Sequence, residues 1–183
     1  MRIRLLSAAA AVALAVAAGA IAAGDLMVGG APMYANRNII QNAVNSKDHT
    51  TLIAAVKAGG LVDTLQGPGP FTVFAPTNAA FAALPEGTVE TLLKPENKEA
   101  LDRILTYHVV PGRLDSQMLD QQIAMGGGKA LLKTVQGEPL TVQGRGKNLM
   151  VTDEKGGTAH VTIADVYQSN GVIQVVDKVL LPN

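Results

Sequence analysis

Apolar residues recur at helical spacing in the first half of the chain and at strand spacing in the second half. Two short runs, over residues 39–44 and 49–58, place their apolar side chains on one helical face each. Asn38 and Asp48 stand just before these runs and are expected to cap the two helices, and Gly59 and Gly60 end the second. The pattern therefore predicts two short helices before residue 61.

A longer amphipathic helix is predicted over residues 96–108. Pro95 stands where the first turn of a helix tolerates proline. Leu101, Ile104, Leu105 and His108 follow at i, i+3, i+4 and i+7, which is the spacing of one helical face. His108 is thus expected to lie on the apolar face.

Strand signals surround and follow this helix. A Gly-Pro-Gly-Pro turn precedes a short strand over residues 71–75, and Thr77 or Asn78 is expected to cap a helical turn that runs to residue 84. Asn170 and Gly171, between two Val/Ile runs, predict a hairpin with positive φ at both positions. Further β-rich runs occupy residues 130–135, 139–143, 148–152, 160–167 and 172–181. Helices first and strands later predict an α+β fold.

The N-terminal segment has the pattern of an export signal. Arg2 and Arg4 precede an apolar run and then small residues, so residues 1–22 are expected to be a signal peptide cut after Ala22. The alternative is an uncleaved membrane anchor, because the run is nearly long enough to span a bilayer. Residues 23–35 are Gly-rich without periodicity and are expected to be a flexible lead. Residues 36–182 then form the single domain.

Composition narrows the classes of function. The formal net charge is +0, and cleavage would take away two of the 15 basic residues against 15 acidic ones. The mature chain is mildly acidic and lacks the basic field that nucleic acid requires. With 48% hydrophobic residues, it has enough apolar material for one core. Cysteine is absent from the sequence, which excludes thiolate metal sites, thiol catalysis and disulfides.

The sequence contains few patterns that are typical of catalytic sites. The run Gly126-Gly127-Gly128-Lys129 lacks the hydroxyl residue that follows the lysine of a phosphate-binding loop. The three histidines, His49, His108 and His160, lack the i, i+4 pairing of a helical metal site, and the serines lack the Gly-x-Ser-x-Gly pattern. We therefore expect no enzymatic activity, no cofactor and no metal.

Three segments resemble the signature blocks of the fasciclin domain. They are TVFAPTNAAFAAL at residues 72–84, the Tyr-His motif within ILTYHVVPG at 104–112, and SNGVIQVVDKVLLP at 169–182. Two positions differ, with Asn78 where the family more often has aspartate and Gln174 where it frequently has histidine. The resemblance extends over roughly residues 36–182.

This resemblance implies a fold and a role. The expected fold is a wedge-shaped β-sandwich of about seven strands with helices packed along one edge. The expected protein is a secreted or periplasmic bacterial single-domain member that acts in adhesion. Its expected partner is a cell-surface, matrix or envelope protein or polysaccharide. It is expected to be a monomer that does not stay in the membrane after cleavage.

The signature segments contain two sets of candidate residues. The candidate binding motif consists of Tyr107, His108, Leu114 and Asp115. The residues expected to have a structural role are Thr77, Asn78, Asn170, Gly171 and Asp177. Asp177 is expected to form a hydrogen bond to the first signature block.

Two alternatives stay open for the Tyr-His motif. His108 either packs into the core with its ring nitrogens satisfied, or contacts a ligand. A second hypothesis for function is a small-molecule or hydrolytic pocket beside His108, with Tyr107 and Asp115 assisting. A ring packed into the core would argue against this second hypothesis.

Overall fold

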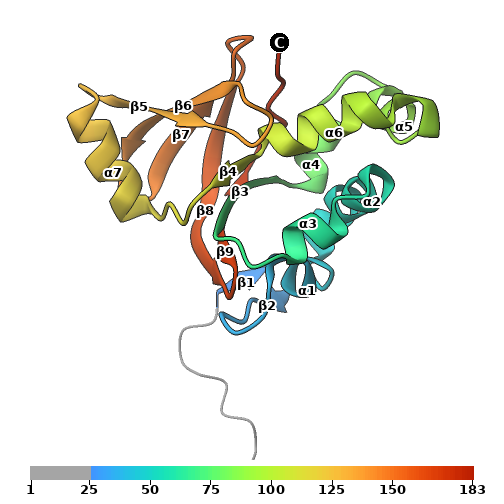
Figure 1. Ribbon diagram of the computed structural model, residues 1–183, viewed down its shortest axis with the longest axis horizontal. Coiled ribbons are helices and arrows are strands. Elements are labelled where there is room, and N and C mark those ends of the chain that lie inside the picture. The colour runs from blue at the N-terminus through green and yellow to red at the C-terminus, as the bar shows by residue number, and fades with distance from the viewer. Residues whose placement is uncertain (1–25) are drawn as a thin grey trace, which may run out of the picture.

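A computed structural model describes residues 26–183, and the predicted signal peptide over 1–22 lies outside the described residues (Figure 1). The helices are α1 (Ile39–Ala43), α2 (Thr50–Gly59), α3 (Val62–Gln66), α4 (Asn78–Ala82), α5 (Thr88–Leu92), α6 (Lys98–Tyr107) and α7 (Ser116–Met125), with 3₁₀ turns at Lys47–His49 and Pro95–Asn97. The strands are β1 (Met27–Val28), β2 (Ala31–Pro32), β3 (Phe71–Pro76), β4 (Val109–Pro111), β5 (Lys129–Lys133), β6 (Pro139–Arg145), β7 (Asn148–Thr152), β8 (Thr158–Gln168) and β9 (Gly171–Val176). Within this part of the chain, no helix has both the length and the apolarity to cross a bilayer.

Seven strands form one continuous sheet in the order β4-β3-β9-β8-β7-β6-β5. The pair β3 and β9 is parallel, and the other neighbours are antiparallel. The long strand β8 contains two register shifts, and the two outer strands come together where Val135 N donates to Val109 O at 2.8 Å. The sheet therefore nearly closes on itself, and the α+β prediction with seven strands is confirmed.

Two hydrophobic cores lie on opposite faces of the central strands. Helices α1 to α6 gather on one side of β3 and β9, and α7 packs on β5 and β6 (Figure 1). Residues of β3 alternate between the cores: Val73 and Ala75 join the helix-side core, and Phe74 joins the sheet-side core. This alternation follows from the two-residue period of a strand that is buried on both faces.

The N-terminal lead is ordered, so the prediction of flexibility over residues 23–35 is wrong for its described part. β1 and β2 form a small hairpin whose Val28, Ala31 and Met33 side chains are buried in the helix-side core. Lys47 N donates to Gly29 O at 3.1 Å and ties the hairpin to the turn before α2. Three apolar side chains reaching one core stabilise the segment despite its lack of periodicity.

Helix starts follow the predicted caps in two of three places. Asn38 caps α1 in a reciprocal pair with Gln41, and the Thr77 hydroxyl caps α4 by accepting from Ala80 N at 3.2 Å. The prediction that Asp48 caps α2 is wrong. Asn78, which is distant in the sequence, caps α2 instead, because its side-chain oxygen accepts a hydrogen bond from Thr51 N at 3.0 Å.

The hairpin between β8 and β9 forms one residue earlier than predicted. Gln168 pairs with Gly171, so the two turn residues are Ser169 and Asn170. Neither of them nor Gly171 has a positive φ. The prediction of a primed turn is therefore wrong. Asn170 instead bonds to α1 and α3 through its side chain, and Gly171 allows the close approach of Phe71 O.

Candidate functional site

Tyr107 fastens helix α6 to the far half of the sheet. Its side chain is fully buried in the sheet-side core at the last residue of α6. The hydroxyl donates to Pro139 O at 2.9 Å and accepts from Glu154 N at 3.1 Å. Burial raises the pKa of Tyr107 to about 12, so the hydroxyl keeps its proton and this bonding pattern at every physiological pH.

His108 is packed into the protein on the opposite side, as the sequence pattern predicts. Its ring is 2% exposed. Nδ1 lies 2.8 Å from Ile104 O, and Nε2 lies 2.9 Å from Leu180 N. Because the Leu180 N–H is a donor, Nε2 accepts and Nδ1–H donates, so one neutral tautomer satisfies both ring nitrogens. Of the two readings of this residue, the geometry favours the structural one.

Burial lowers the pKa of His108 to about 4, with the Ile104 carbonyl opposing the shift. The pKa in the folded protein lies below the ordinary value of 6.5, so the unfolded chain binds more protons between these values. The stability that this neutral ring contributes is therefore present above pH 6.5 and is lost as pH falls toward 4. Burial lowers the pKa of His49 too, which adds a loss of the same sign.

We expect the free energy of unfolding to fall by about 2 kcal/mol from His108 alone between pH 7 and pH 5. Urea denaturation at several pH values measures this slope. The variant His108→Gln cannot titrate at this position, so its free energy of unfolding is expected to depend much less on pH between pH 7 and pH 5. His160→Gln, which replaces an exposed ring, serves as the control and retains the slope. Equal slopes in the wild type and in His108→Gln would show that the ring is not buried as a neutral group.

Leu114 and Asp115 lie beside the motif but do not form an exposed site with it. Leu114 is 8% exposed, so this candidate binding residue is largely buried. Its backbone N–H donates to the Thr72 hydroxyl at 2.8 Å. Asp115 caps α7 by accepting from Met118 N at 2.9 Å, and its other oxygen accepts from Tyr167 OH at 3.2 Å. Of the four predicted binding residues, only Asp115 reaches the surface.

Asn170 connects the central hairpin to the helical side. Its side-chain oxygen accepts from Ile39 N at 3.0 Å, the first N–H of α1. Its amide nitrogen donates to Leu65 O at 2.7 Å and Gly67 O at 2.9 Å, at the end of α3. Three bonds from one buried side chain satisfy the ends of two helices, so this signature residue holds the fold together.

Asp177 does not bond to the first signature block, contrary to the prediction. It accepts from His160 N at 2.7 Å, and its other oxygen lies 3.5 Å from His160 Nδ1, so its partner is strand β8. Gln174 is fully buried and bonds to Asp165, whose N–H donates to the Gln174 side-chain oxygen at 3.1 Å.

Sequence reasoning missed Asp165. This residue has a φ of 60°, in the left-handed region, and sits at an irregularity of β8. Its carboxylate accepts from Ser116 N at 2.7 Å and from Ser116 Oγ at 2.6 Å, which secures the first residue of α7. An aspartate that interrupts the apolar alternation of a strand is the signal that marks it.

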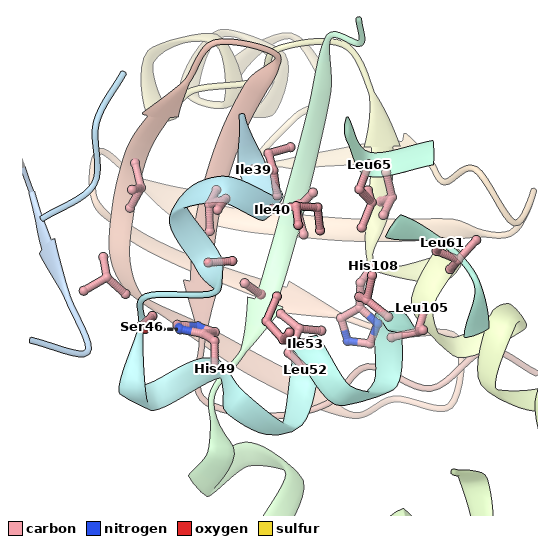
Figure 2. A pocket seen from close by; sticks show the side chains of 18 of the residues that line it. Ile39, Ile40, Ser46, His49, Leu52, Ile53, Leu61, Leu65, Leu105 and His108 are labelled. Carbon is pink, nitrogen blue, oxygen red and sulfur yellow. Dashed lines mark hydrogen bonds between the residues drawn. The ribbon is translucent and has the colours of Figure 1, made fainter. Parts of the chain in front are cut away.

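An apolar cavity of about 40 Å³ lies between the helices and the sheet (Figure 2). Aliphatic side chains of α1, α2, α3, β3 and β9 line most of it, together with Val28 and Met33 of the N-terminal segment. Its polar lining residues are Ser46, His49 and His108. A void of this size costs on the order of 1 kcal/mol of stability.

This cavity does not have the features of a hydrolytic site. Both nitrogens of His108 are occupied by backbone groups, and neither Tyr107 nor Asp115 lines the cavity. Tyr107 belongs to the other core. The three residues that the second hypothesis requires are therefore not brought together. Residues 26–183 also contain no group of three or more side chains arranged to hold a metal ion.

Several large apolar side chains are exposed on helix α7, on strand β5 and just after β5. These side chains are Met118 (44%), Met125 (81%), Leu131 (67%) and Val135 (45%). A groove here has walls that include Val110, Pro111, Leu114, Gln122, Leu131, Lys133 and Val135. Met125 lines an adjoining hollow together with Gln122 and Leu131. We call this surface the α7–β5 groove.

Comparison with known proteins agrees with this architecture. The Fasciclin domain model matches residues 47–182. The chain is 48% identical to Protein sll1483 of Synechocystis over 79% of this chain and 73% of that protein. It is 34% identical to the cell surface glycolipoprotein MPB83 of Mycobacterium bovis over 91% and 76% of the two chains.

A solved structure shows the same fold. The fasciclin domain pair of the insect cell adhesion molecule fasciclin I superposes with a TM-score of 0.70 at 17% identity, over 79% of this chain and 51% of that chain. The fold, the family match and the order of the three signature segments agree. This chain belongs to the fasciclin domain family.

Proposed function

We propose that this domain is a non-enzymatic binding module that acts at the cell surface or outside the cell and recognises a protein of the envelope or matrix. Its membership in the fasciclin family supports this role, as does its similarity to a relative named as a cell surface glycolipoprotein. The polar residues that other functions would need are occupied by the fold: His108 and Tyr107 both bond to backbone groups.

The observation that carries the proposal is the α7–β5 groove. Leu131 and Met125 are 67% and 81% exposed, which is unfavourable unless a partner covers them. Leu114 lines the groove, so one residue of the predicted binding motif belongs to it. In this proposal the groove recognises the partner, and the buried Tyr107 and His108 stabilise the fold.

The chemistry of the groove favours a protein over a polysaccharide. Its rim carries Lys129 and Lys133 on either side of Leu131, and strand β5 is the last strand of its sheet. A partner segment with an apolar side chain and flanking acidic residues complements this arrangement. A polysaccharide offers few apolar groups to cover Leu131 and Met125.

The test compares a double variant at the groove with a single variant elsewhere, both of which replace exposed apolar side chains with serine. The double substitution Leu131→Ser and Met125→Ser is expected to weaken binding to intact cells or their isolated envelope by at least about tenfold. Val44→Ser, which changes a 49%-exposed valine on the helical side, is expected to bind like the wild type. Fluorescently labelled protein and flow cytometry give the dissociation constants.

Melting temperatures close to that of the wild type show that all variants remain folded. Undiminished binding by the double variant would overturn the assignment to the groove. A wild-type protein that binds neither cells nor envelope would overturn the proposed function itself.

A further inference from the structure

Beyond the surface role, we propose that the cavity between helices α1 to α3 and the sheet binds a small aliphatic molecule that carries one hydrogen-bonding group, and that His49 Nε2 is the partner of that group. The cavity and the α7–β5 groove share none of their lining residues, so the two proposals stand independently. The class of ligand is a very small alcohol or carbonyl compound, of about the size of methanol, because the cavity measures about 40 Å³.

The walls of the cavity determine the apolar part of the ligand. Ile39, Ile40, Leu52 and Leu65 converge on it from the helices (Figure 2). Ile173 of β9 also lines it. Its lining contains neither phenylalanine, tyrosine nor tryptophan. Flexible aliphatic walls adapt to a small apolar group and provide no flat surface against which a planar ring would stack.

His49 provides the polar contact. The residue is 3% exposed, and Nδ1 lies 2.9 Å from Ser46 Oγ, which leaves Nε2 as the second ring nitrogen (Figure 2). Nε2 is buried and has no hydrogen-bond partner. The Ala75 carbonyl lies close to the ring and partly offsets the lowering of the pKa of His49 by burial. Its geometry does not meet that of a full hydrogen bond from Nε2. His49 thus combines a buried, unpaired polar atom with a wall position in the cavity.

His108 cannot take this role, although it lines the same cavity. Ile104 O and Leu180 N occupy its two nitrogens. The Ser46–His49 pair can exchange donor and acceptor roles, because a serine hydroxyl both donates and accepts. Nε2 can therefore donate to a carbonyl or accept from a hydroxyl.

The size and polarity of the cavity favour such a ligand over water. Its volume of about 40 Å³ exceeds the roughly 10–15 Å³ that one water needs. A buried water also needs two to four polar partners, roughly, and the cavity offers Nε2 as its unpaired polar atom. A molecule with one polar group and a small apolar group removes both the void and the unpaired nitrogen.

Titration of the full protein with methanol and with chloromethane tests the proposal, because both molecules are small enough for a cavity of about 40 Å³. Both compounds are expected to shift the methyl resonances of Ile39, Val56 and Leu65 in ¹H–¹³C spectra. Only methanol is expected to shift the ¹⁵N resonance of His49 Nε2. This readout uses the unaltered protein, so it does not depend on whether a variant folds.

Two variants separate the contributions of the cavity and of the imidazole. His49→Asn keeps a polar atom near Ser46 but has none at the Nε2 position, so the affinity for methanol is expected to fall about fivefold while that for chloromethane changes little. Ala43→Leu places extra atoms in the cavity and is expected to abolish the methyl shifts with both compounds. The proposal is overturned if methanol leaves these methyls unmoved, or if it moves them without any effect on His49 Nε2.

Discussion

Replacing His108 with alanine is expected to lower the free energy of unfolding by about 4 kcal/mol. The substitution removes a buried ring next to an existing cavity and leaves the Leu180 N–H without its acceptor. It also loses the bond between Nδ1 and Ile104 O, which holds the ring at the end of α6. Urea denaturation at pH 7 followed by circular dichroism measures the change.

Glutamine is the matched control at this position. Its side-chain amide can place an acceptor close to the position of Nε2, so His108→Gln is expected to recover part of the loss. The ordering of the three proteins tests whether the bond to Leu180 matters, beyond the volume of the ring. An alanine variant with unchanged stability and impaired binding to cells would instead make His108 a ligand residue.

Gly171→Ala is expected to cost at least about 3 kcal/mol of stability. A methyl group on Gly171 would lie 2.0 Å from Phe71 O, in the strand that pairs with it in parallel. Backbone atoms cannot move aside as a flexible side chain does, so β3 and β9 have to separate at this end. Thermal and urea denaturation both measure the loss.

Gly127→Ala is the control for the loss of a glycine as such. Gly127 has a φ of 70°, and nothing lies within 4 Å of the added methyl group. It is therefore expected to cost only about 1 kcal/mol, from the left-handed backbone alone. Similar losses in the two variants would mean that the close approach to Phe71 has no energetic importance.

Local periodicity was sufficient to predict much of the fold. The helix that contains Leu101 and Leu105, and the strand over residues 148–152, coincide with α6 and β7 within about two residues at either end. The burial of His108 also followed from its place on that helical face. These features depend on the spacing of neighbours along the chain, which the sequence displays directly.

Features that depend on contacts distant in sequence were missed or assigned to the wrong partner. Asn78 caps α2, and Asn170 bonds to α1 and α3, although nothing nearby in sequence indicates either partner. Gly171 was attributed to a turn, whereas the approach of Phe71 requires it. The hairpin β1–β2 has too few residues to show a period, so its burial could not be predicted.

The candidate site shows the same division. The sequence marks the Tyr-His motif, but which neighbouring side chains are exposed depends on how α7 packs on the sheet. Leu114 turned inward and Leu131 outward, although both are leucines in short apolar segments. His49 gave no signal in the sequence, because its unpaired nitrogen is a property of the cavity that three helices and the sheet enclose.

The position of β9 has a consequence for how the chain acquires its structure. This strand lies between β3 and β8, yet it is made after both of them. During synthesis the pair β4–β3 and the group β8 to β5 cannot join into one sheet until β9 has been made. β3 then pairs with a segment about a hundred residues downstream. Assembly is therefore expected to be slow and to finish only after the ribosome has released residues 171–176.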